Sequence, residues 1–430
     1  MYIFRSCFLL DSTEMPQETG KRFLSHASMK LLNRLVILRC IRNEGPISRV
    51  DLQKRTRLSW GTISASTREL LDSGILTETG EVVTDMGRRP VELDLNRAGN
   101  YVLGLQLGNA LVRSVLMDIK GGVVGELDVP VNASGTSGEI IRRLTDTGQR
   151  LLSKQGLRSG TLMGIGVAVP GAVDFSTGVS LYAPQHPNWK NVAVKERFEK
   201  TFGVPCFVDH SFNCSALSEQ LFGLGKGLQN YICVLIGTGV AAGIVLGGEV
   251  YRGENGLAGE FGHTCIEENG LLCACGNRGC IEAYISGPAL VASARKELRG
   301  KRAGASPLAA AGDRKGITAE HIYHAAQQGD ALAIRVFARM GTVLGIGISN
   351  LINIFNPQTV ILGGFVCQAS EFFLPNCIEA VNKKAWHASP KDVKVSQLLR
   401  SAVRGAGVLV LEQLFTSGQI VDRAISLRKK

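Results

Sequence analysis

Apolar residues recur every three or four positions from Leu32 onward, and this spacing predicts a series of short helices. The first helix ends at Gly45-Pro46, and a second begins at Ser48 in a sequence that resembles a capping box. A third helix begins at Ser59 and ends at Gly74. Its inward face, like those of the two before it, is apolar, with Leu35, Leu38, Ile41, Leu52, Ile63, Leu70 and Leu71. Three helices with a tight turn between the second and third predict a helix-turn-helix.

Short segments with strand-like composition follow these helices and predict a β-hairpin wing. The segments are residues 75–79, 82–84 and 91–95. The second and third are joined by a loop that contains Gly87-Arg88-Arg89-Pro90. We therefore predict a winged helix-turn-helix domain over residues 30–96, preceded by a disordered tail over residues 1–29, which has no sustained hydrophobic period.

The pattern changes near residue 97 to apolar strands that alternate with helices. Residues 101–108 form an apolar strand, residues 140–152 an amphipathic helix, and residues 164–169 and 232–236 further buried strands. The alternation predicts an α/β fold for the second domain, over residues 97–430.

Composition agrees with this division and limits the class of protein. A chain of 430 residues predicts two or three domains, and a hydrophobic content of 45% allows a large core. There is no run of 18 uninterrupted apolar residues, and the start of the chain makes a poor signal peptide, so we predict a cytoplasmic protein without a membrane span. The formal charge of +11 favours a polyanionic partner.

The positive charge is dense in the first domain. Between residues 33 and 69, eight Arg or Lys residues face three acids, which suits contacts with DNA phosphates. Small and polar side chains on the outer face of the third helix suit a major groove, and the wing arginines suit a minor groove. The predicted DNA-binding residues are Ser59, Gly61, Thr62, Ala65, Arg68, Arg88 and Arg89. The alternative for this domain is a helical bundle that binds only protein.

One His and three Cys fall within eighteen residues of the second domain and predict a metal site. His263, Cys273, Cys275 and Cys280 supply the four soft or borderline ligands of a closed tetrahedral zinc site. Isolated buried thiols or disulfides are the alternatives, and the clustering with a His favours zinc over both. Two carboxylates, Glu260 and Glu282, flank the cluster.

This stretch resembles the signature of the ROK family, which contains sugar kinases and sugar-responsive transcriptional repressors. The matching pattern is Gly-x-x-Gly-Glu-x-Gly-His from residue 256, followed by Cys-x-Cys-Gly-x-x-Gly-Cys-x-Glu from residue 273. The resemblance implies a two-lobed actin-like ATPase fold, zinc on the His and three Cys, and sugar contacts from Glu260, His263 and Glu282. The front of the chain is similar to the winged helix of ROK repressors, in which a Gly-Arg-Arg-Pro wing is typical.

The chain departs from the kinase pattern at two positions that catalysis needs. In ROK kinases an Asp that directly follows an Asn acts as the base, and these positions are Ser211 and His210 here. We include His210 among the predicted sugar contacts. In the first phosphate motif the kinase Asp is replaced by Gln106. A base and an acid that organises magnesium are both needed for phosphoryl transfer, so we predict that the protein is not an enzyme.

The sequence therefore predicts a ROK-family transcriptional regulator, with repression the favoured sign of regulation. Its expected partners are a double-stranded DNA operator, a sugar or sugar-phosphate effector, and a second copy of the chain in a homodimer or larger assembly. The rival interpretation is an ATP-dependent sugar kinase fused to a DNA-binding domain. A third is a DNA-binding protein whose pocket no longer binds a ligand, which the retained Glu260, His263 and Glu282 disfavour.

Overall fold

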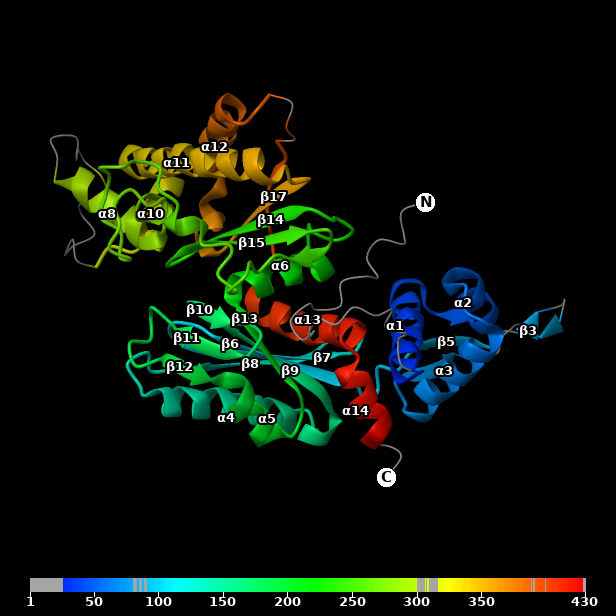
Figure 1. Ribbon diagram of the computed structural model, residues 1–430. Helices are drawn as coiled ribbons and strands as arrows, with labels where there is room; N and C mark the ends of the chain where they lie inside the picture. The colour runs from blue at the N-terminus through cyan, green and yellow to red at the C-terminus, as the bar shows by residue number, and fades with distance from the viewer. Residues whose placement is uncertain are drawn as a thin grey trace, which may run out of the picture.

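The computed structural model places a small helical domain beside a larger domain made of two α/β lobes (Figure 1). The structure describes residues 26–427, apart from 80–82, 85–86, 89–90, 300–305, 307, 309–315, 388, 390 and 399. We call residues 26–96 the head, and we call the two lobes of the remainder lobe 1 and lobe 2. The mixed α/β architecture predicted from the sequence is confirmed.

The head is a three-helix unit with a small sheet. Its helices are α1 (His26–Glu44), α2 (Arg49–Thr56) and α3 (Trp60–Asp72). Its strands are β1 (Ile47–Ser48), β2 (Leu76–Thr79), β3 (Val83–Thr84), β4 (Gly87–Arg88) and β5 (Glu92–Leu95), with sheet order β1-β5-β2 and a separate β3–β4 hairpin. The predicted caps are present: Ser48 Oγ accepts from Asp51 N at 3.1 Å, and Ser59 Oγ accepts from Thr62 N at 3.2 Å.

Two predictions about the head need comment. Helix α1 begins at His26, so the last four residues of the predicted tail are helical. The start of this helix is held within the head by the pair of Lys30 with Glu69 of α3, and outside the head by the contact of Leu31 with Gly418. In the wing, the backbone of Arg88 lies in β4, whereas Arg89 lies outside the described residues.

Lobe 1 is built on a five-stranded sheet in the order β13-β9-β6-β7-β8. The strands are β6 (Tyr101–Leu107), β7 (Leu111–Asp118), β8 (Val123–Pro130), β9 (Leu162–Val169) and β13 (Cys206–His210). Helices α4 (Ser137–Lys154) and α5 (Val194–Phe202) cover its outer face. A small sheet of β10 (Ala172–Asp174), β11 (Val179–Tyr182) and β12 (Lys190–Ala193) and a 3₁₀ turn, η1 (Ser159–Thr161), complete the lobe.

Lobe 2 has a second five-stranded sheet, in the order β16-β15-β14-β17-β18. The strands are β14 (Tyr231–Ile236), β15 (Val240–Leu246), β16 (Glu249–Val250), β17 (Thr359–Gly363) and β18 (Val393–Val395). The helical elements are η2 (Phe261–His263), α7 (Glu282–Ile285), α8 (Gly287–Leu298), α10 (Ala319–Gln327), α11 (Ala331–Phe355), η3 (Phe365–Ala369) and α12 (Ser370–Lys384). Among the described residues, α11 alone is long and apolar enough to cross a membrane, but more than half of its apolar window is buried inside lobe 2.

Two helices, α6 (Ser211–Phe222) and α13 (Ser401–Thr416), lie between the two sheets and pack against each other (Figure 1). Their approach needs residues without a Cβ. A Cβ on Gly405 of α13 would lie 1.6 Å from the carbonyl oxygen of Cys214 in α6. On the other side of α13, a Cβ on Gly166 of β9 would lie 1.8 Å from the Ala406 carbonyl oxygen. Helix α13 is therefore held by direct backbone packing on both sides.

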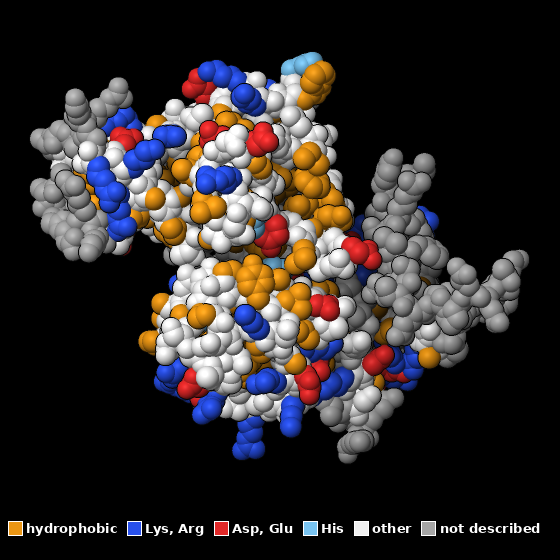
Figure 2. Space-filling model, turned by 60° about the vertical axis from the view of Figure 1, so that its left-hand side comes forward, with side chains coloured by type: hydrophobic (Ala, Val, Ile, Leu, Met, Phe, Trp, Pro, Cys, Tyr) orange, Lys and Arg blue, Asp and Glu red, His pale blue; other side chains and the backbone are white. Residues whose placement is uncertain are grey.

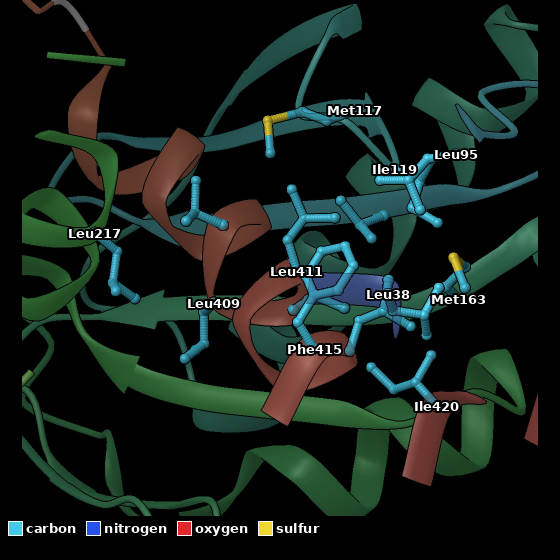
Figure 3. Close-up of a cluster of buried hydrophobic side chains, with 14 of the residues drawn as sticks. Leu38, Leu95, Met117, Ile119, Met163, Leu217, Leu409, Leu411, Phe415 and Ile420 are labelled. Atoms are coloured by element: carbon cyan, nitrogen blue, oxygen red, sulfur yellow. The ribbon is translucent and has the colours of Figure 1, made fainter. Parts of the chain in front are cut away.

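The hydrophobic core of the head continues into lobe 1. Leu38 of α1 and Leu95 of β5 belong to the same buried cluster as Met163, Leu411 and Phe415 (Figure 3). The short helix α14 (Gln419–Leu427) follows α13 and adds Ile420 to this cluster. Because apolar surface buried between domains resists their separation, the head and lobe 1 form one packed unit.

Ion pairs surround this apolar contact and use arginines that the sequence suggested for DNA. Arg34, 7% exposed, pairs with Glu69 of α3 and with Asp422 of α14, the latter at 2.9 Å. Arg42 pairs with Glu412 of α13 at 2.7 Å and lies over the ring of Phe415. Arg39 donates to the Phe415 carbonyl oxygen. Three of the eight basic residues that make up the positive surplus of this stretch are therefore engaged in the joint between the head and lobe 1.

We expect Arg34→Ala to weaken the joint between head and lobe 1. The change leaves Glu69 with Lys30 and removes the link to Asp422, and depriving a partly buried charge of a partner costs about 1–3 kcal/mol. Calorimetry should then show the head unfolding before the rest, in place of a single transition. Arg55→Ala is the control, because Arg55 and Glu44 form an exposed pair that contributes about 1 kcal/mol or less. Equal melting curves for the two variants would contradict this account of the joint.

Candidate functional site

A cavity of about 770 Å³ lies between the two lobes. The space-filling view shows the waist between the lobes as a hollow with acidic and His side chains near its opening (Figure 2). Its wall includes Gln106 and Gln185 of lobe 1, and Ser211 and Glu282 at the starts of α6 and α7. Glu260 and His263, from the segment with the predicted zinc ligands, also line it. The structure thus brings five predicted or motif positions and Gln185 to one cavity.

The four predicted metal ligands converge beside this cavity. The ligand atoms of His263, Cys273, Cys275 and Cys280 all lie within 4.8 Å of one another. Cys275 Sγ is 3.7 Å from Cys280 Sγ, and Cys273 Sγ is 3.8 Å from His263 Nδ1. A Zn–S bond of about 2.3 Å gives a tetrahedron with edges of about 3.8 Å, so the donor set and its spacing fit zinc.

Two thiols of this cluster favour the protonated form, whereas a backbone hydrogen bond from Asn277 lowers the pKa of the third, Cys275. Burial and the neighbouring thiols raise the pKa of Cys280 to about 12, and burial raises the pKa of Cys273. A bound cation reverses this preference, because metal ligation stabilises thiolates and releases their protons. The loop between His263 and Cys280 contains only isolated β-bridges, such as Cys265 with Cys280, so little regular structure holds it.

Glu260 links the metal cluster to the cavity. Its Oε2 lies 3.9 Å from His263 Nε2, while Nδ1 of the same ring faces Cys273. A ligating His commonly presents its second ring nitrogen to a carboxylate, which orients the ring. Burial raises the pKa of Glu260, the His263 ring lowers it, and the Glu282 carboxylate raises it further. The two carboxylates therefore act on one region of the cavity.

Glu282 is held by the loop that follows β14. It begins α7, and its Oε2 accepts from Val240 N at 2.8 Å. The backbone of Gly239 runs against the same carboxylate, so that a Cβ there would lie 2.9 Å from Glu282 Oε2. The other carboxylate oxygen is left for a ligand, since a carboxylate has two acceptor atoms.

His210, a predicted sugar contact, is not among the residues that line the cavity. The ring lies behind the cavity wall, 1% exposed, and it stacks on Phe212 at 4.4 Å between ring centroids. Burial lowers the pKa of His210 to about 4, so the ring is neutral at physiological pH. Ser211 and Phe212, not His210, line the cavity, because the chain turns into α6 at this point and carries the His side chain away.

Sequence reasoning did not find the role of Asp209, which lies next to His210. Its carboxylate is 1% exposed, accepts from Asn213 Nδ2, and pairs with Arg252 at 2.8 Å. The Arg252 guanidinium in turn covers the ring of Phe175 at 3.9 Å. This buried pair joins the end of β13 to the loop that leads to Glu260, so it supports the cavity wall from behind.

Two positions that carry acidic residues in ROK kinases carry neutral residues here: Ser211 at the position of the base and Gln106 at the position of the Asp in the first phosphate motif. Gln106 Oε1, Gln185 Oε1 and Ser211 Oγ are buried atoms without a hydrogen-bond partner within the described structure. Buried polar atoms are normally paired, so these three await donors from a ligand or from water. Nearby, Asn109 Nδ2 donates to Thr238 Oγ1 at 3.2 Å and joins the two phosphate-type loops across the cavity.

The predicted DNA-binding residues lie together on the head. Ser59, Gly61, Ala65 and Arg68 are exposed along one face of α3, and Thr62 is half-buried beside them. The exposed ring of Trp60, at 50%, belongs to the same face and was missed, because an aromatic at a helix start reads as core from sequence. The side chains of Arg88 and Arg89 lie outside the described residues.

Comparison with known proteins agrees with both domains. Residues 102–413 match the ROK family, and residues 32–77 match the family described as winged helix-turn-helix DNA-binding. The chain is 30% identical to the xylose repressor of Caldicellulosiruptor bescii, covering 91% of this chain and 98% of that protein. It is 30% identical to the N-acetylglucosamine repressor of Escherichia coli O157:H7, covering 89% and 93%.

Two solved structures, a regulator and a kinase, differ in how much of this chain they cover. A ROK family transcriptional regulator, a homologue of E. coli MLC protein, superposes with a TM-score of 0.83 at 30% identity and covers 93% of this chain and 99% of its own. A ROK family glucokinase from Streptomyces griseus, in complex with glucose and AMPPNP, superposes with a TM-score of 0.63 at 29% identity, covering 72% of this chain and 98% of its own. With a ROK match over most of its length and a winged helix-turn-helix in front, the chain belongs to the ROK family and has the architecture of its transcriptional regulators.

Proposed function

We propose that the protein is a sugar-responsive transcriptional repressor that binds its effector without phosphorylating it. The observation that carries this proposal is the joining of a DNA-reading head and a kinase-like cavity through one packed interface. The names of the relatives, which are repressors for xylose or N-acetylglucosamine, support the same function. We place the protein in the cytoplasm, where it acts on an operator as a homodimer or larger assembly.

The wall of the cavity favours a polyhydroxy ligand. Glu260 and Glu282 supply acceptors for sugar hydroxyls, and the unpaired oxygens of Gln106, Gln185 and Ser211 supply more. A hydroxyl can donate to one such atom and accept from another group, which suits a wall with so many acceptors. The cavity also exceeds what a single monosaccharide fills, so a sugar or a sugar phosphate fits it.

Helix α13 supplies the physical connection between the effector and the operator. Its first residues, Ser401 and Ala402, line the cavity, and Glu412 near its other end pairs with the head. Sixteen residues of α-helix span about 24 Å, and the close packing around Gly405 prevents the helix from bending locally. An effector that moves the start of α13 therefore also moves the head and changes the placement of α3 on DNA.

Zinc is the cofactor we propose for the His263 and three-Cys cluster, and its role is structural. The ion would fix a loop with little regular structure, and it would hold His263 against Glu260. The cluster supplies four protein ligands, so no position remains for a metal-bound water. Zinc thus organises the effector site and takes no part in a reaction.

We expect purified protein to contain about one zinc per chain. Cys275→Ser should weaken zinc binding by more than about 100-fold and lower the melting temperature, because metal binding is coupled to loop folding. Cys265→Ser is the matched control: its thiol is exposed and lies outside the four-ligand cluster. Metal analysis by mass spectrometry and a thermal melt measure both effects. Metal-free protein with an unchanged melt would contradict the proposal.

Substituting the carboxylates in the cavity should weaken effector binding and leave operator binding unchanged. Glu260→Gln keeps the shape but loses a charged acceptor, which costs roughly 1.5–3 kcal/mol, so we expect about tenfold or weaker sugar affinity by calorimetry. Arg68→Ala should give the converse result, with weaker operator binding and unchanged sugar affinity. The sugar is first found by a thermal-shift screen. Unchanged affinity in both Glu260→Gln and Glu282→Gln would place the effector site elsewhere.

We expect no steady phosphoryl transfer from ATP to hexoses or amino sugars. Ser211 replaces a base whose loss costs about a hundred- to ten-thousand-fold, and Gln106 replaces an acid near magnesium. Ser211→Asp alone should restore little turnover, because the nucleotide side remains altered. Product analysis with ATP, magnesium and a sugar panel measures this directly. Turnover near 1 per second, roughly the kinase range, would favour a kinase fused to a DNA-binding domain.

A further inference from the structure

A second basic surface lies on lobe 1, away from the head and the cavity. It is formed by the outer sides of α4 and α5 and the loops beside them. Residues 137–203 contain nine Lys or Arg and five Asp or Glu, so they contribute +4 to a chain total of +11. The exposed basic residues are Arg142, Arg143, Arg150, Lys154, Arg158, Lys190, Arg197 and Lys200. Figure 2 shows Lys and Arg side chains gathered along this lower edge of the molecule.

These side chains have no acidic partners. Within the described residues, none of the eight forms a salt bridge, whereas Arg49, Lys54 and Arg55 of the head each pair with an acid. Exposed cations are commonly balanced by neighbouring carboxylates, which reduces their attraction for other ions. Apart from Arg142, which helps to lower the pKa of the Glu139 carboxyl, these cations on lobe 1 remain available to a partner in solution.

Three of them form a stripe on α4. Arg143, Arg150 and Lys154 are spaced by seven and four residues, which places them on one side of the helix over about 16 Å. The helix is strongly amphipathic, and an adjoining face, with Leu144 and Leu151, is buried on the lobe 1 sheet. The stripe is therefore held on a rigid element.

The basic surface is also fixed relative to the helix that reads DNA. Arg423 of α14 donates to the carbonyl oxygen of Gly203, directly after α5, at 2.6 Å. The same α14 contacts α3 and pairs with Arg34 through Asp422. In Figure 1, α5, α14 and α3 follow one another along the same side of the molecule. DNA held by α3 would thus meet a second rigid row of cations.

We propose that the α4–α5 surface binds the phosphate backbone of DNA beyond the bases that the head reads. This inference rests on the proposed DNA-binding function and extends it to a second, sequence-independent contact. Positively charged side chains that approach duplex DNA release condensed counterions, which strengthens binding without selecting bases. None of the exposed large apolar side chains of the described residues lies on α4 or α5, and an apolar centre is what a protein partner uses, so DNA is the partner that the chemistry of this surface fits.

The test compares a variant of the stripe with a variant of equal charge. Arg143→Ala, Arg150→Ala and Lys154→Ala are combined in one full-length protein. The control combines Lys296→Ala, Arg299→Ala and Arg339→Ala, three exposed residues of lobe 2 that form no salt bridge within the described structure. All six side chains are exposed, so both variants should keep the wild-type melting temperature.

The probe is a duplex that the wild-type protein selects from a random-sequence pool. The duplex is made in two lengths. One is limited to the half-sites that the wild-type protein protects from nuclease cleavage, and the other is extended by about 15 base pairs on each side. For each protein, the association constant is measured from low to high salt. The logarithm of the association constant falls linearly with the logarithm of the salt concentration. The slope of this line reports the number of phosphates contacted, at about 0.9 per phosphate.

On the extended duplex, we expect the stripe variant to lose about 2–3 in slope, while the control retains the wild-type value. On the short duplex, all three proteins should have the same slope and affinity. If stripe and control variants behave alike on the extended duplex, the proposal is wrong, and an acidic protein becomes the better partner for this surface. If the wild-type protein selects no duplex at all, the DNA-binding function itself fails, which is a different outcome.

Discussion

The backbone packing of α13 is the contact on which the other parts of the structure depend. This helix lies against α6 on one side and the lobe 1 sheet on the other, at distances that only Gly405 and Gly166 permit. Its start lines the cavity and its end meets the head. A close-packed helix cannot absorb a displacement locally, so it transmits movement from one end to the other. The arrangement of the two lobes, the cavity and the orientation of the head are thus mechanically connected.

A second, more local constraint is the shape of the loop that carries the His263 and three-Cys cluster. The loop between His263 and Cys280 is built from turns and isolated β-bridges and contains no helix or sheet, yet it leads directly into α7, which begins at Glu282. A tetrahedral ion with four protein ligands would supply rigidity at small cost in chain length. The orientation of the His263 ring toward Glu260 would then connect this carboxylate of the cavity wall to the ion. The buried pair of Asp209 and Arg252 supports the same wall from the opposite side.

The cavity has the architecture of a kinase site, with neutral groups at two positions where the kinases have acids. Gln106 and Ser211 keep polar atoms in the wall but provide neither a base nor an acid for magnesium. A site built in this way can still discriminate among sugars, because unpaired buried acceptors penalise ligands that lack the matching hydroxyls. Binding energy that a kinase directs to the transition state is then available to shift the balance between two conformations.

The sequence alone determined the features that rest on local patterns. Helix caps at Ser48 and Ser59, the helix-turn-helix and the spacing of the His and Cys ligands all follow from residues close together in the chain. The same holds for the two altered kinase positions. Only the tertiary structure decided which charges were free. Arg34, Arg39 and Arg42 read as DNA contacts because their partners, Asp422, Phe415 and Glu412, lie more than 350 positions away. His210 likewise turned out to lie behind the cavity wall, because the direction of a side chain at a strand end depends on where the following helix packs.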